Sequence, residues 1–222
     1  ARQMLPLVGA MIGLLLLFRL RVPNLLTPEN LIDLTQQISV NAIIAFGMTL
    51  VILIGGIDLS VGALVALVGT SSVYILGAST PLAQSGWWAL PAMAAGLGVA
   101  MLFGAFNGMA AAKTKMPPFI ITLAAMLVVR GAALRFNEGR PMAIPDTQKL
   151  FLSVGNGRVF GWLPTPVLIM LIAFTATTIL LHFTRFGRQL YGIGGNYEAA
   201  RLSGIPIVRR TIAVYVICAL LA

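Results

Sequence analysis

Apolar runs separated by short polar segments extend along the whole chain. The hydrocarbon core of a bilayer is about 30 Å thick, so a helix that crosses it needs about 20 predominantly apolar residues. Counted between ionisable side chains, the sequence has room for about seven such helices. We expect them at residues 4–18 and 33–58, two within 59–112 joined by a loop near 77–86, then at 118–134, at 164–181, and from about 207 onward. This pattern predicts an all-α, polytopic transmembrane protein.

The last apolar run still continues where the sequence ends at Ala222, and the sequence begins without a methionine. We therefore expect residues 1–222 to form a single transmembrane domain that is incomplete at its C-terminus. The first apolar run has only Arg2 before it and no small-residue cleavage pattern. We interpret it as a retained span and not as a signal peptide.

Composition supports a membrane protein. Over 222 residues the chain is 59% hydrophobic and 9% charged, with a mean hydropathy of +0.95, far from the values of soluble domains. The net charge of +9 does not indicate nucleic-acid binding, because Lys and Arg of a polytopic protein gather in cytoplasmic loops. Cys218 is the one cysteine, which excludes an internal disulfide and a cysteine-rich metal site.

The basic residues also predict orientation. Many of them gather in residues 185–210, and Lys113 and Lys115 lie in the short loop two spans earlier. Both segments should face the cytoplasm, which also places the N-terminus inside. The expected external loop at 135–165 carries four basic residues against this trend, partly offset by Glu138 and Asp146.

Residues 196–206, NYEAARLSGIP, have the pattern of a short helix in water with both ends marked. Asn196 is the expected N-cap, and Glu198 lies in the first turn, where the helix dipole favours an anion. Arg201 follows three residues later, and Gly204 is the expected stop. We expect the apolar surface of this helix to dock into a groove on a partner, through Ala199, Ala200, Leu202 and Ile205.

Small residues recur at every fourth position along the fourth expected span: Gly96, Ala100, Gly104, Gly108 and Ala112. Such a stripe lets another backbone approach closely, which favours helix packing in a membrane. We interpret it as packing within this chain, with a subunit interface as the alternative. Asn107 lies beside the stripe, and because hydrocarbon offers its amide no partner, we expect an interhelical hydrogen bond.

Gly55 and Gly56 interrupt the apolar sequence between the second and third spans, and Asp58 and Ser60 follow them. This spacing is typical of a helix start, where free N–H groups need a cap. Two interpretations remain open: a tight turn with Asp58 as a cap near the inner membrane face, or a helix break within the membrane that lines a solute pathway. Polar residues on one face of the second span add weight to a polar lining: Asp33, Gln37 and Asn41.

Three segments together resemble the permease subunits of bacterial ABC sugar importers, in the branch that includes ribose permeases. They are GMTLVILIGGIDLSVGALVAL at 47–67, TPVLIM at 165–170 and TRFGRQLYGIGGNYEAARLSGI at 184–205. The last contains the EAA-three-residues-G pattern of binding-protein-dependent importers, formed by Glu198, Ala199, Ala200 and Gly204.

The resemblance implies a transport subunit in the bacterial inner membrane, with about ten spans of membrane-crossing length in the whole protein. It implies that residues 185–206 form a cytoplasmic coupling loop that docks on an ATP-binding subunit. It also implies a second permease subunit and a periplasmic sugar-binding protein that delivers a neutral sugar. ATP and Mg would be used by the partner ATPase, and no cofactor is expected on this chain.

The residues also weigh against other functions. The chain has no GxxxxGK[ST] phosphate loop, so ATP hydrolysis is expected in a partner subunit. An enzyme is not expected, because His182 is the one histidine and lies at the end of a span. The alternative function is an ion-coupled secondary carrier that uses Asp58 as its proton or sodium site.

Overall fold

The computed structural model describes residues 5–77, 86–114 and 116–222. Its helices are α1 (Leu5–Arg21), α2 (Pro28–Leu53), α3 (Val61–Leu76), the short η2 (Gly86–Trp88), α4 (Ala89–Lys113), α5 (Pro118–Asn137), α6 (Lys149–Asn156), α7 (Thr165–Phe183), α8 (Arg185–Gly195), α9 (Tyr197–Leu202) and α10 (Ile207–Leu221). Two short antiparallel strands, β1 (Arg158–Val159) and β2 (Leu163–Pro164), lie between α6 and α7. The loop expected at 77–86 lies almost entirely outside the described residues.

Each of the expected apolar segments contains a described helix, which confirms an all-α, polytopic membrane protein. By length and composition, four described segments can cross a membrane, at residues 28–53, 86–113, 118–136 and 165–183. Three more apolar helices are shorter: α1 with 17 residues, α3 with 16 and α10 with 15.

The helix α2 has different bounds from those expected. It begins at Pro28 and not near Asp33, because Thr27 caps its first turn and accepts a hydrogen bond from the N–H of Asn30. The expected start at Asp33 comes from counting apolar residues between charged ones. Glu29 nevertheless lies in the first turn of α2, where the helix dipole favours an anion, so the helix includes this charge. The helix then ends at Leu53, so residues 54–60 are a separate non-helical segment before α3.

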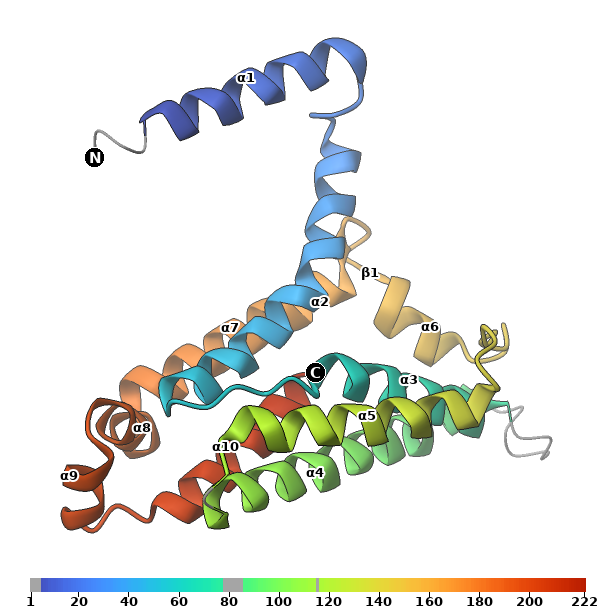
Figure 1. The fold of residues 1–222 in the computed structure, drawn as a ribbon. Helices are drawn as coiled ribbons and strands as arrows, with labels where there is room; N and C mark the ends of the chain where they lie inside the picture. The colour runs from blue at the N-terminus through green and yellow to red at the C-terminus, as the bar shows by residue number, and fades with distance from the viewer. Residues whose placement is uncertain (1–4, 78–85, 115) are drawn as a thin grey trace.

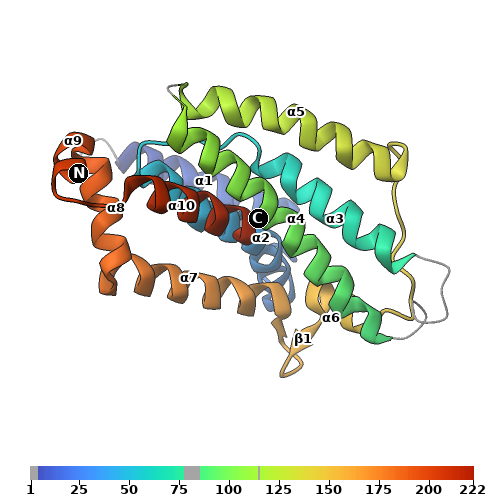
Figure 2. The ribbon, with the colours of Figure 1, turned by 90° about the horizontal axis from the view of Figure 1, so that it is seen from below.

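The long helices run alongside one another, and their connections gather at two ends (Figure 1). Figure 2 shows α8 and α9 together at one end, and α6 and β1 at the other. We call these the α9 end and the α6 end. The helix α1 extends away from the bundle (Figure 1). Apolar side chains such as Leu17 and Leu20 are exposed along it.

The two largest groups of buried side chains form most of the core. One joins α2, α8 and α10 through Leu50, Leu190 and Tyr215. The other joins α3, α4 and α5 and includes Leu64 and Val129. Since α10 packs against both α2 and α4, it connects the two groups.

Glycines of the small-residue stripe lie where α4 meets its neighbours in the same chain. A methyl group at Gly104 would lie 2.8 Å from the carbonyl oxygen of Tyr215, and one at Gly108 would lie 2.8 Å from the Cα of Ile212. At Gly96 it would lie 2.5 Å from the Oγ of Ser72 on α3. The backbone of α10 therefore rests directly on α4, where no side chain fits.

This packing gives the first prediction. Gly104→Ala should destabilise the protein by about 1–3 kcal/mol, because the added methyl overpacks the α4–α10 contact. Gly98→Ala is the matched control, since Gly98 lies on the same helix with nothing within 4 Å of an added methyl. The control should be neutral or slightly stabilising, because Ala has the higher helix propensity. Thermal unfolding of both variants in detergent measures the difference, and equal midpoints would show that the contact is not tight.

Candidate functional site

The helix α9 is short and is fixed at both of its ends. The Oδ1 of Asn196 accepts a hydrogen bond of 2.9 Å from the N–H of Ala199, which caps the N-terminus. At the C-terminus Gly204 has a φ of +75°, a left-handed conformation that favours glycine. Glu198 and Arg201 form an exposed ion pair of 2.8 Å across one turn. These contacts hold a helix of six residues at the protein surface.

The expected apolar surface of α9 is divided between two sides. Ala200 is buried together with Ile193 and Ile207, and Ile205 packs against this cluster. In contrast, Ala199 is exposed and Leu202 is 81% exposed. The expectation that all four side chains face a partner is therefore wrong. The reason is that α8 lies beside α9 and covers Ala200.

In the expected coupling loop at 185–206 the sequence predicts one helix, at 196–206, whereas the structure has a further helix there, α8. Two signals could have identified it. Thr184 is an N-cap that accepts a hydrogen bond of 3.2 Å from the N–H of Gly187. Apolar side chains follow at the i, i+4, i+7 spacing of an amphipathic helix: Phe186, Leu190 and Ile193.

The backbone of α8 touches the ends of two long helices. Any side chain at Gly187 would collide with the carbonyl oxygen of Leu181 in the last turns of α7. A side chain at Gly194 would likewise collide with the carbonyl oxygen of Leu53, the last residue of α2. Because Leu190 is also fully buried between these contacts, α8 is fixed to α2 and α7.

Directly after Leu53 comes the break between α2 and α3. Gly55 takes a φ of +78°. Asp58 is 6% exposed, and its Oδ1 accepts hydrogen bonds from the N–H of Ser60 at 2.9 Å and from the Oγ of Ser60 at 2.6 Å. The Oγ of Ser60 accepts in turn from the Nδ2 of Asn107, at 2.8 Å. Asn107 therefore makes the expected interhelical hydrogen bond, from α4 to the start of α3.

Ser60 does not cap α3 with its side chain. Its backbone already has helical φ and ψ, and its hydroxyl is engaged by Asp58 and Asn107. Asp58 takes the N–H of Ser60, which satisfies one backbone donor at the helix start.

Two residues that the sequence did not single out also hold the break. The Oγ1 of Thr122 on α5 accepts from the N–H of Leu59 at 3.1 Å and lies 3.1 Å from the carbonyl oxygen of Ile57, to which it can donate. Tyr215 on α10 lies over Gly56, where an added methyl would be 2.9 Å from the phenolic oxygen. A threonine or tyrosine inside an apolar helix gives no sequence signal of such a role.

A cavity of 170 Å³ lies between the break and the helices α8 and α9. Its wall includes Gly55 and Gly56 from the break, Ile193 from α8, Tyr197 from α9 and Tyr215 from α10. Ile54 also packs against the cluster that contains Ala200, so the break and this expected coupling residue are neighbours at the α9 end.

Asn41 lies elsewhere. It is exposed near the middle of α2, about 18 Å along the helix from Leu53, and the structure does not bring it together with the break. Asp33 and Gln37 are exposed on the same side of α2, nearer the α6 end.

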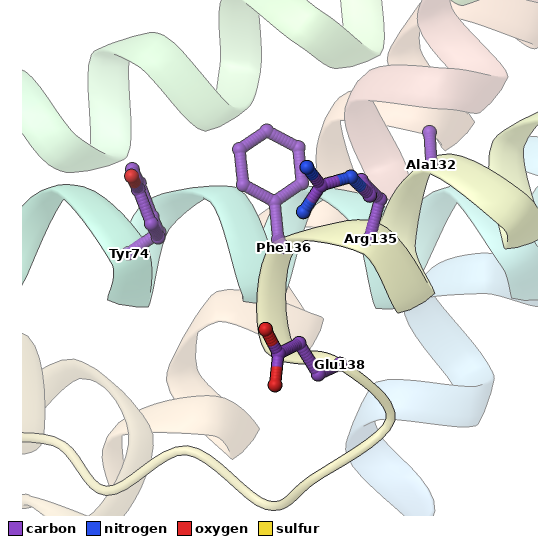
Figure 3. Close-up of a pocket in the computed structure, with 5 residues that line it drawn as sticks. All are labelled: Tyr74, Ala132, Arg135, Phe136 and Glu138. Atoms are coloured by element: carbon purple, nitrogen blue, oxygen red, sulfur yellow. The ribbon is translucent and has the colours of Figure 1, made fainter.

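A larger cavity, of 650 Å³, lies between α3 and α5 toward their α6 ends. Its wall includes Tyr74, whose ring meets that of Phe136 edge to face with centroids 5.4 Å apart. In Figure 3, Arg135 points to the same side of α5 as Phe136, whereas Glu138 points to the other side. The charged side chains therefore do not converge on one point.

The fold and these features define a polytopic helical membrane protein with a surface helical unit fixed to a break between two spans. The chain belongs to the family described as "Branched-chain amino acid transport system / permease component", which it matches over residues 30–222. No solved structure matches the chain.

Several curated proteins are similar to it. The ribose import permease protein RbsC of Escherichia coli strain K12 is 46% identical over 202 residues, 90% of this chain and 60% of that protein. RbsC of Bacillus subtilis strain 168 is 41% identical over 217 residues, 98% of this chain and 65% of that protein. The L-arabinose transport system permease protein AraH of Escherichia coli strain K12 is 35% identical over 201 residues, 90% of this chain and 58% of that protein. The chain thus spans less than two thirds of the length of these relatives.

Proposed function

We propose that this chain is the membrane-spanning subunit of an ATP-driven importer that translocates a neutral sugar. Its family comprises permease components of transport systems, and the similar proteins named above import ribose or transport L-arabinose. By this proposal the chain lies in the bacterial inner membrane with its N-terminus in the cytoplasm. A periplasmic binding protein delivers the sugar, and a second permease subunit completes the path.

The structural observation that supports coupling to an ATPase is the contact between α8 and the end of α2. An ATP-binding subunit that docks on the exposed side of α9, around Glu198, Ala199 and Leu202, would displace α9 and α8 together. Because the backbone at Gly194 rests on the carbonyl oxygen of Leu53, α8 cannot approach α2 further without moving it. Such a displacement therefore reaches residues 54–60 and the cavity beside them.

ATP and Mg belong to the partner subunit in this proposal. Gly192 and Gly194 lie within α8, where they pack against Ile205 and Leu53, and they do not form an open phosphate-binding loop. ATP binding shifts the population between inward-open and outward-open packings only through contacts that differ between the two. In this proposal, the contacts that differ between the two packings are those between the ATP-binding subunit and the exposed side of α9.

The second prediction tests this coupling. Gly204→Val should lower sugar uptake and sugar-stimulated ATP turnover several-fold at an unchanged protein level. A β-branched residue at a φ of +75° is strained by at least about 1–2 kcal/mol, which tilts or frays the end of α9. The measurement is uptake in proteoliposomes with the ATPase and the binding protein.

Gly195→Val is the matched control, because Gly195 also has nothing within 4 Å of an added methyl but has helical backbone angles. It should retain most of the activity. Full uptake by Gly204→Val at wild-type abundance would contradict a coupling role for α9.

A third prediction separates the importer from an ion-coupled carrier. Uptake should continue when the proton and sodium gradients are collapsed and cellular ATP is maintained. Asp58→Asn should retain partial uptake, because the amide oxygen can still accept the N–H of Ser60. If the unmodified protein stops transporting without an ion gradient, the ATP-driven mechanism is wrong and Asp58 becomes the coupling site.

The fourth prediction concerns orientation. Leu202→Cys and Phe160→Cys, each in a Cys218→Ser background, place thiols at side chains that are 81% and 84% exposed, at the α9 end and the α6 end. A membrane-impermeant thiol reagent added to intact spheroplasts should label the cysteine at position 160 and spare the one at 202. Opening the membrane should expose the second site. The reverse pattern would put α9 outside the cell, where no ATPase could reach it.

A further inference from the structure

The side of α2 near the α6 end carries a row of polar side chains that the coupling mechanism does not use. Asp33, Gln37 and Asn41 follow one another at intervals of one turn, and all three are exposed. The side chains of Gln37 and Asn41 make no hydrogen bond to the residues that the structure describes. In hydrocarbon such carboxamides would lack partners at a considerable cost, so this side of α2 does not face lipid tails.

A cavity of 450 Å³ opens at this row. Its polar wall is formed by Asp33, Gln36 and Gln37 of α2 and by Asn156 at the end of α6. Its apolar lining includes Val40 and Pro166. The volume lies within the range of about 300–1,000 Å³ that is usual for small-molecule sites.

Two contacts hold the α6–β1 segment against α2 and so shape the cavity. The Nε2 of Gln36 donates to the carbonyl oxygen of Gly155, at 3.3 Å. The Nη2 of Arg158 lies 3.5 Å from the Oδ1 of Asp33, and both side chains are about half exposed. One positive and one negative charge balance here, so the cavity does not select a solute by net charge.

We propose that this cavity is an entry site for a neutral polyhydroxylated solute, a pentose-sized sugar, bound through Asp33 and Gln37. The inference rests on the proposed importer function. Each sugar hydroxyl is both a donor and an acceptor, and it is matched by carboxamides, which offer both, beside a carboxylate that accepts. Gln37 is the middle residue of the polar row. It lines the cavity, and Asn41 lies one turn further along α2.

A branched-chain amino acid fits this cavity less well. Its ammonium and carboxylate groups would need both Asp33 and Arg158 as partners, so their ion pair would have to open, whereas a sugar hydroxyl can donate to Asp33 while the pair stays intact. Its aliphatic side chain would have Val40 and Pro166 to pack against, because the other side chains of this wall are carboxamides and a carboxylate. The chemistry of the wall therefore favours the sugar.

The test uses the intact transporter in proteoliposomes with its ATPase and binding protein. Gln37→Met removes the amide but keeps the length of the side chain, and it should raise the apparent KM for D-ribose or L-arabinose about two- to tenfold, the effect of one lost hydrogen bond. Thr35→Val is the matched control, because the hydroxyl of Thr35 bonds only to the carbonyl of Ile32 on its own helix. The control should leave the KM unchanged.

A second readout does not depend on transport. Gln37→Cys, in a Cys218→Ser background, should be labelled by an impermeant thiol reagent, and millimolar D-ribose or L-arabinose should slow the labelling while L-leucine should not. Thr35→Cys should show no such protection.

Three results would overturn the site. They are an unchanged KM in Gln37→Met, protection by L-leucine in place of the sugars, or no labelling at position 37 because a further helix or a second copy covers it. A complete lack of uptake by the unmodified transporter would instead overturn the proposed function, so the two failures are distinguishable.

Discussion

The bundle depends on places where one backbone touches another with no side chain between them. Lipid tails are as apolar as the helix surfaces, so helices in a membrane associate through close packing and hydrogen bonds. Gly104 and Gly108 bring α10 onto α4, and this contact places Tyr215 over Gly56 in the break. Gly194 brings α8 onto the end of α2 in the same way. Close glycine contacts therefore determine both the core and the position of the break beside α8.

The break itself is held by side chains from two other helices. Residues 54–60 lack the hydrogen-bond pattern of a helix, and where they are buried their N–H and C=O groups need other partners. The hydroxyl of Thr122 on α5 accepts from the N–H of Leu59 and can donate to the carbonyl oxygen of Ile57. Asn107 on α4 donates to the hydroxyl of Ser60, which in turn donates to Asp58. The shape of the break thus depends on α4 and α5, and it can change only if these hydrogen bonds are exchanged for others.

Sequence reasoning succeeded where the cause of a structure is local. The caps of α9 at Asn196 and Gly204 follow from the preferences of single residues, and the apolar runs follow from the thickness of a bilayer. It failed where the cause is another helix. Whether Ala200 faces a partner or the core depends on α8, and the role of Thr122 depends on a segment 63 residues earlier in the chain. The hydroxyl of Ser60 likewise has partners that local sequence does not indicate, since it bonds to Asn107 of α4.

Under the proposed mechanism, α2 connects the two ends of the molecule. A methyl at Gly47 would lie 3.0 Å from the Cα of Cys218, so the backbones of α2 and α10 touch there. Leu53, which contacts α8, lies about 9 Å along the helix from this point, and Asp33 lies about 21 Å away on the other side. A helix that tilts about the Gly47 contact therefore moves its far end roughly twice as much as its near end, and in the opposite direction. A small displacement of α8 would in this way become a larger movement of the polar side of α2.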